Sequence, residues 1–144
     1  MTDLESLFPN LQRSAYRVTS PSAEAYNCLA WAAGRDDEWW DPAPRRSWPD
    51  DVPRQPTIEN LIRVFEHVGF VCCDDGGLEA GFEKIAIYGD ENEYEHAAKQ
   101  LPSGKWTSKL GADEDIEHET TDALEGVQYG RVLRFMKRRV ADAT

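Results

Sequence analysis

A short turn in the second half of the chain constrains the fold more than any other feature. Pro102-Ser103-Gly104 separates two segments that suit β-strands, residues 94–101 and 105–110. Proline is favoured at the first position of such a turn, and glycine at the left-handed position that closes a three-residue hairpin loop. A loop of this length places Leu101 opposite Lys105. The sequence therefore predicts an antiparallel hairpin with a defined register.

That register decides which side chains share a face of the predicted hairpin. Counting outward from the turn, Ala98 opposes Ser108, which makes His96 and Ser108 diagonal neighbours on one face. A diagonal separation of about 7 Å between Cα atoms allows a side chain to orient an imidazole ring, at least through a water. A loop of two or four residues would instead put Thr107 and Lys109 beside His96.

Residues 26–34 are predicted to contain a short helix that starts with a cysteine. Asn27 is a favoured N-cap and Gly34 a favoured residue after the helix end, so Cys28 lies in the first turn. Unpaired backbone N–H groups and the helix dipole favour a thiolate at that position. Cys28 is therefore a candidate nucleophile. The alternative is that Cys28 packs in the core as a small apolar residue, as free cysteine often does.

These residues together suggest a catalytic arrangement. A helix-start cysteine, followed some 70 residues later by a strand histidine and a polar residue on the paired strand, has the chain order of papain-like cysteine hydrolases. Cys28 would attack an amide bond and His96 would act as the base. Ser108 is the first candidate for the residue that orients His96. Asp115, just beyond the hairpin, is the second, because its carboxylate could turn back to His96.

Four segments of the chain resemble an uncharacterised family of small bacterial proteins. They are YNCLAWA at 26–32, HAAKQL at 96–101, WTSKLG at 106–111 and EDIEH at 114–118. More distantly, the layout is similar to NlpC-type and CHAP-type peptidoglycan amidases and endopeptidases. That resemblance implies Cys28 as nucleophile, His96 as base and Ser108 in the third position, where those families usually carry histidine, asparagine or an acid.

A metal or cofactor is not expected. His118 together with His96 and Cys28 could supply zinc ligands, but no closely spaced ligand pair indicates such a site. The adjacent pair Cys72 and Cys73 lacks the spacing of a zinc knuckle, and we expect both in the core.

The remaining pattern indicates one helix and several strands. Thr57 and Gly69 bound apolar residues at helical spacing, which predicts a helix over residues 58–68. The expected strands are residues 70–73, 84–88, 94–101, 105–110 and 129–139, the last of which also suits a helix. We therefore expect residues 1–144 to form a single α+β domain, a small papain-like fold in which a mainly antiparallel sheet of four or five strands packs on two helices.

Residues 35–56 contain five prolines and three tryptophans, so they sustain neither a helix nor a central strand. We expect a long ordered loop there. Its tryptophans either shape a lid over a ligand groove or anchor an irregular strap over the core.

Composition narrows the possible partners. The chain has 27 acidic and 16 basic residues and a net charge of −11, which argues against nucleic acid and against an anionic membrane. Such a charge suits a basic protein partner. The first hypothesis is a hydrolase that acts on a peptide or amide substrate. The alternative is a non-catalytic acidic binding or inhibitor protein with a hydrolase-like fold. An odd number of cysteines and a start without a secretory signal pattern predict the cytoplasm.

Overall fold

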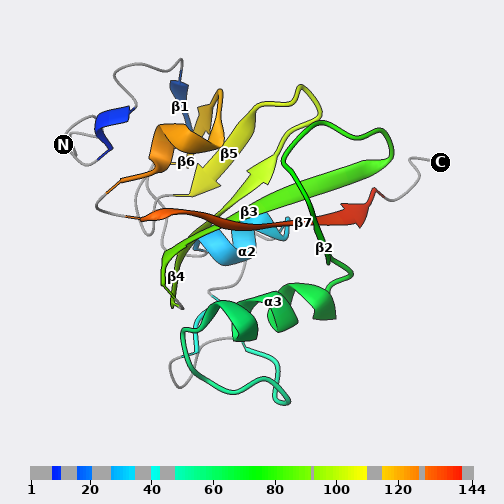
Figure 1. Cartoon of the computed structure of the whole chain (residues 1–144). Coiled ribbons are helices and arrows are strands. Elements are labelled where there is room, and N and C mark those ends of the chain that lie inside the picture. The colour runs from blue at the N-terminus through cyan, green and yellow to red at the C-terminus, as the bar shows by residue number, and fades with distance from the viewer. Residues whose placement is uncertain are drawn as a thin grey trace.

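The computed structural model describes residues 8–10, 16–20, 27–34, 40–42, 48–91, 93–109, 115–126 and 129–140. Within these ranges the chain forms a seven-stranded antiparallel sheet and two short α-helices (Figure 1). The strands are β1 (Tyr16–Ser20), β2 (Val71–Cys73), β3 (Phe82–Asp90), β4 (Glu93–Gln100), β5 (Trp106–Lys109), β6 (Asp115–His118) and β7 (Arg131–Arg139). Their order across the sheet is β1-β6-β5-β4-β3-β7-β2.

The expectation of a papain-like sheet with four or five strands on two helices is wrong, because β1 and β6 extend the sheet to seven strands. The segment that forms β6 is an acidic run, which on charge alone suggests a solvated turn. In the sheet, however, Ile116 and His118 are fully buried, and only Glu117 between them meets solvent, where it pairs with Arg17 of β1. The acidic composition of this segment therefore gives no sign of a strand whose Ile116 and His118 lie in the core and whose Asp115, on the other side, is also buried.

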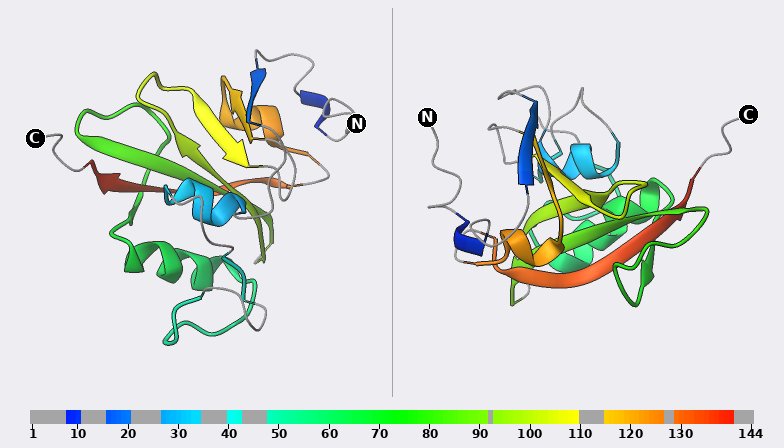
Figure 2. Two further views of the ribbon diagram at one scale, coloured as in Figure 1. Left: turned by 180° about the vertical axis from the view of Figure 1, so that it is seen from behind. Right: turned by 90° about the horizontal axis from the view of Figure 1, so that it is seen from above.

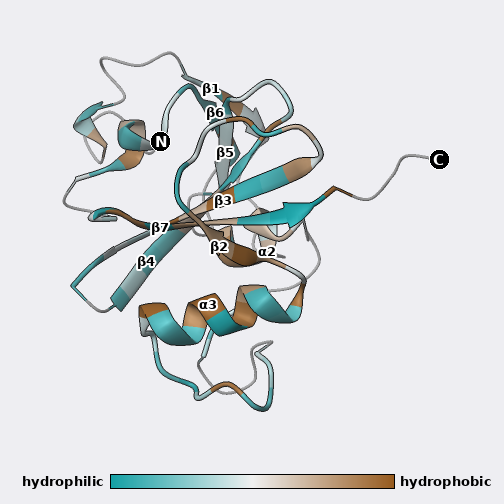
Figure 3. Cartoon of the chain, turned by 45° about the vertical axis from the view of Figure 1, so that its right-hand side comes forward, coloured by the Kyte–Doolittle hydropathy of each residue, from teal (hydrophilic) through white to brown (hydrophobic). Residues whose placement is uncertain are grey.

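Both α-helices begin at the residues that the sequence indicates. The helix α2 (Cys28–Ala32) follows Asn27, whose side-chain oxygen accepts a hydrogen bond from the Ala30 N–H at 3.2 Å. The helix α3 (Ile58–His67) follows Thr57, which caps its first turn in the same way. Hydrophobic and hydrophilic residues alternate along α3 in Figure 3, as an amphipathic helix requires. No helix within the described ranges is long and apolar enough to cross a membrane.

The sheet is covered on both faces. We call the side that carries α2 and α3 the helix face; its core includes Leu29, Ala30, Leu61, Phe65, Ile85, Ile87 and Ala97. We call the opposite side the far face; its core is Phe8, Ala86, Tyr88, Ala98, Trp106, Ile116, Ala123 and Leu124. The short 3-10 helix η2 (Thr121–Leu124) supplies the last two of these residues, and Figure 2 shows it on the other side of the sheet from α2. Burial on both faces explains the continuous apolar run in β3.

The predicted hairpin is confirmed. The Leu101 N–H donates to the Lys105 carbonyl oxygen at 2.7 Å, and Gly104 has a φ of +92°. Lys99 lies opposite Thr107, as a three-residue loop requires. Continued by one step, this register sets Ala98 opposite Ser108.

The loop over residues 35–56 is described only at 40–42 and 48–56. Trp40 and Trp48 are buried in the helix-face core, each 7% exposed. Asn27 holds the loop to the start of α2, because its side chain exchanges two hydrogen bonds with the Trp40 backbone. These two tryptophans therefore act as anchors, while Trp39 lies outside the described residues.

Candidate functional site

Cys28 occupies the predicted position at the start of α2, but its surroundings do not favour a thiolate. The residue is half-buried and packs against the helix-face core. Burial raises the pKa of the Cys28 thiol to about 11, although the backbone of Ala97 and of Leu29 partly offsets this effect. The thiol is therefore protonated at neutral pH, because burial raises its pKa more than the backbone hydrogen bonds lower it.

His96 lies in the core of the far face. It is fully buried, and its ring stacks on Tyr129 with centroids 4.1 Å apart and an interplanar angle of 1°. Tyr88 packs against it at 5.2 Å. Burial lowers the pKa of His96 well below its ordinary value, and the nearby His118 adds to this effect. Within the described residues, neither ring nitrogen of His96 has a hydrogen-bond partner.

The sheet separates Cys28 from His96. Cys28 lies against Ala97, whose side chain belongs to the helix-face core, and His96 is the neighbour of Ala97 in β4. Successive side chains of a strand point to opposite faces, so His96 points away from α2. The structure therefore does not bring the candidate nucleophile and the candidate base together. Tyr94 packs against the same core as Cys28, and its pKa is raised chiefly by burial and further by the nearby Asp41 and Cys28.

A bulge in β4 explains how Tyr94 reaches the helix face. Tyr88 pairs with His96 but the next residue, Gly89, pairs with Tyr94, which leaves Glu95 without a partner in the ladder. One extra residue reverses the alternation, so Tyr94 and His96 lie on opposite faces although they are two positions apart.

Ser108 lies on the same face as His96, as the hairpin register predicts, but its partner is a different histidine. The Ser108 Oγ lies 2.8 Å from Nε2 of His118, and Nδ1 of His118 lies 2.8 Å from the Thr120 carbonyl oxygen. Because a carbonyl only accepts, Nδ1 carries the proton, and Ser108 donates to Nε2. Sequence reasoning considered His118 only as a zinc ligand. The signal that could have placed it here is the alternation of Ile116 and His118 around a charged residue.

The Ser108–His118 pair has the hydrogen bonding of a serine nucleophile and its base, yet its environment opposes that role. Both side chains are fully buried, so a substrate does not reach them in this structure. Burial also lowers the pKa of His118 to about 4, which makes it a weak base at neutral pH. We interpret the pair as a structural link between β5, β6 and the segment that leads into η2.

Asp115 does not take the orienting role either. It lies opposite Lys109 in the β5–β6 ladder, next to the Ser108–Ile116 pair that faces the far side. Alternation therefore directs Asp115 and Lys109 to the helix face, away from His96. Within the part of the chain that the structure describes, no group of three histidine, cysteine or acidic side chains is arranged to hold a metal ion.

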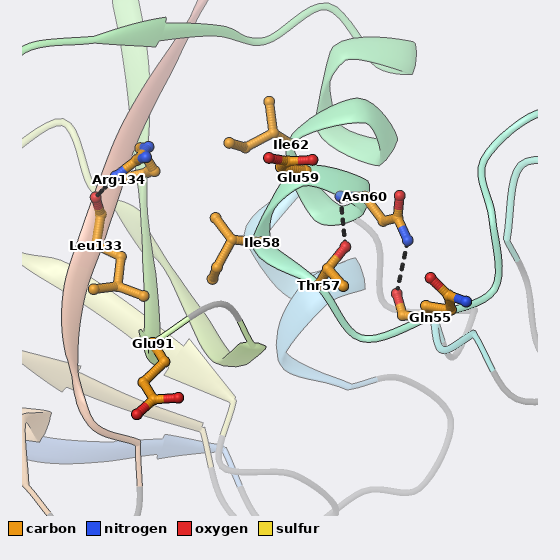
Figure 4. Close-up of a pocket in the computed structure, with 9 residues that line it drawn as sticks. All are labelled: Gln55, Thr57, Ile58, Glu59, Asn60, Ile62, Glu91, Leu133 and Arg134. Carbon is orange, nitrogen blue, oxygen red and sulfur yellow. Dashed lines mark hydrogen bonds between the residues drawn. The ribbon is translucent and has the colours of Figure 1, made fainter.

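A groove that none of these residues lines lies between the start of α3, strand β7 and the β3–β4 turn (Figure 4). We call it the α3 groove. Its volume is about 390 Å³, and it is lined by Gln55, Thr57, Ile58, Glu59, Asn60, Ile62, Glu91, Leu133 and Arg134. Apolar side chains form one part of the lining, and two carboxylates and a guanidinium form another.

Comparison with known proteins places the chain in a family. Residues 17–137 match the model of a family described as a domain of unknown function (DUF7689). The chain belongs to this family. The match covers most of the sequence and agrees with the resemblance to an uncharacterised family. No curated protein and no solved structure matches the chain.

Proposed function

We propose that this member of the DUF7689 family is a non-catalytic protein that binds a basic protein partner. The observation that carries the proposal is the separation of Cys28 from His96 by the sheet, with Cys28 on the helix face and His96 on the far face. A cysteine hydrolase needs its base within hydrogen-bond reach of the thiol. His67 is not brought to the thiol either, because it lies on the exposed side of α3, where its Nε2 is 2.9 Å from a carboxylate oxygen of Asp51.

The competing proposal is a cysteine amidase or peptidase of the kind that the distant resemblance to NlpC-type and CHAP-type enzymes implies. The feature in its favour is the place of Cys28 behind the Asn27 cap of α2. It requires a conformation in which an imidazole reaches the helix face. The raised pKa of Cys28 and the burial of His96 both count against it.

The charge of the chain supports a binding role. A net charge of −11 attracts basic partners and speeds their association, as it does for acidic inhibitors of basic enzymes. All three cysteines are free thiols, and the prediction that Cys72 and Cys73 both lie in the core is wrong, because Cys72 is exposed and Cys73 is only half-buried. An exposed free thiol suits a reducing compartment, and we propose the cytoplasm.

Thiol labelling distinguishes the two proposals. We expect iodoacetamide at neutral pH to modify Cys72 first and Cys28 last, with Cys28 reacting at a useful rate only after unfolding, because its thiol is protonated and faces the core. Tryptic mass spectrometry measures the three rates separately.

His96→Phe serves as the matched variant for this experiment, since it removes the imidazole and keeps a ring on Tyr129. The binding proposal expects Cys28 labelling to be equally slow in the variant. If Cys28 is instead the fastest thiol and His96→Phe slows it, the hydrolase proposal replaces ours.

A further inference from the structure

We infer that the α3 groove binds a lysine or arginine side chain, with its adjacent backbone, from a basic partner protein. This inference rests on the proposed binding function and assigns a place to it. Such a side chain has an apolar stem and a charged end, so a site for it needs an apolar floor next to carboxylates. The groove supplies both.

The floor of the groove is apolar. Ile58 is 6% exposed, while Ile62 and Leu133 are partly buried against the helix-face core and keep part of their surface accessible. In Figure 4 these three side chains lie between α3 and β7. The methylene groups of a lysine or arginine would contact this floor and remove its exposed area from water.

Two carboxylates border the groove without ion-pair partners. Glu59 in the first turn of α3 and Glu91 in the β3–β4 turn are both exposed, and neither forms an ion pair with the residues that the structure describes. Glu91 also has a φ of +53°, a left-handed conformation that is uncommon outside glycine. The turn therefore holds this carboxylate beside the groove at some cost in backbone free energy.

Carboxylates at the other end of the sheet differ in this respect. Asp75 lies 3.1 Å from the ammonium group of Lys84, and Glu79 lies 2.9 Å from that of Lys137. Glu83 pairs with Arg138 in the same way. Those acids are neutralised within the chain, whereas Glu59 and Glu91 keep their charge available for a cation from outside.

Arg134 can fix the orientation of a bound segment in the groove. One of its guanidinium nitrogens donates to the Leu133 carbonyl oxygen at 2.7 Å, so the remaining N–H groups can bind a backbone carbonyl of the partner. The volume of about 390 Å³ lies near the lower end of the range for small-molecule pockets, roughly 300–1,000 Å³. It is large enough for one long side chain and its flanking backbone.

The test uses a peptide probe, acetyl-Gly-Leu-Arg-Leu-Gly-amide, and a second peptide in which neutral citrulline replaces arginine. Both are titrated into the ¹⁵N-labelled protein and followed by two-dimensional NMR. We expect the arginine peptide to shift the signals of residues 57–62, Glu91 and Leu133. Citrulline should weaken binding by about threefold or more, as should Glu59→Gln or Glu91→Gln, because each removes one attraction between charges near the surface.

Glu66→Gln is the matched control, since it makes the same charge change on an exposed position of α3 that does not line the groove. It should alter binding by less than about 1.5-fold. Equal weakening by Glu66→Gln, equal binding of the citrulline peptide, or shifts spread evenly over the acidic surface would each overturn the inference. The Cys28 labelling experiment does not depend on the groove, so failure there refutes the proposed function, and failure here alone refutes the site.

Discussion

Acidification should destabilise the fold through its two buried histidines. His118 has a pKa of about 4 in the folded protein, against about 6.5 in an unfolded chain. Between these pH values the unfolded state binds a proton that the folded state excludes. The free energy of unfolding is therefore at its full value above pH 6.5 and decreases as the pH falls. At about 1.36 kcal/mol per pKa unit, the full loss below pH 4 is about 3 kcal/mol, and about 2 kcal/mol of it occurs between pH 7.5 and 5.

His96 acts in the same direction. Its pKa is also lowered by burial, and the described residues offer its ring nitrogens no hydrogen bond that would favour a charge. The carboxylates that pair with lysine, Asp75 and Glu79, have lowered pKa values and lose their contribution only at more acidic pH. The interval from pH 7.5 to 5 therefore reports mainly on the histidines.

Urea unfolding followed by tryptophan fluorescence at several pH values in this interval measures the effect. His96→Phe should flatten the pH dependence, because it removes one of the two groups that titrate on unfolding. His67→Gln removes an exposed histidine on α3 and serves as the control for loss of a histidine outside the core. A free energy of unfolding that stays constant down to pH 5, or equal flattening by the two variants, would refute the reasoning.

Two further predictions concern stability near neutral pH, where each change in the free energy of unfolding is measured by urea titration. Gly104→Val should lower the free energy of unfolding by about 1 kcal/mol or more, because a β-branched residue resists a φ of +92°. Gly104→Asn should lower it less. Equal losses for the two variants would show that the turn does not need this conformation. Ser108→Ala should lower the free energy of unfolding by about 1–3 kcal/mol, because it leaves Nε2 of His118 buried without a donor. Ser103→Ala, in the exposed turn, should change it little. If Ser108→Ala leaves the stability unchanged, the assignment of that hydrogen bond is contradicted.

Local chemistry in the sequence was a good guide to local structure. The caps at Asn27 and Thr57 and the turn at Gly104 each depend on a few neighbouring residues, and the structure has all three where the sequence places them. The hairpin register was also predictable, because loop length alone sets it. The same register put His96 and Ser108 on one face, as the structure has them.

The sequence could not predict whether α2 packs on the face of the sheet that carries His96 and Ser108 or on the opposite face. The hairpin determines which residues share a face, but the side on which α2 packs depends on contacts between segments some 70 residues apart. Ala97, rather than His96, lies under Cys28 for this reason. The strand β6 was missed for a related reason, because its acidic residues suggest a solvated segment, and its outer edge is covered only by β1, a strand about 100 residues away in the chain.

The order of the strands has a consequence for how the molecule is assembled. Strands β3 to β6 follow one another in both chain and sheet, so they can pair through short loops soon after they are made. The strand β7 lies between β3 and β2 but comes after both in the chain. During synthesis the facing edges of β2 and β3 therefore stay unpaired until β7 has left the ribosome. Throughout that time the nascent chain exposes two strand edges that can pair with other polypeptides.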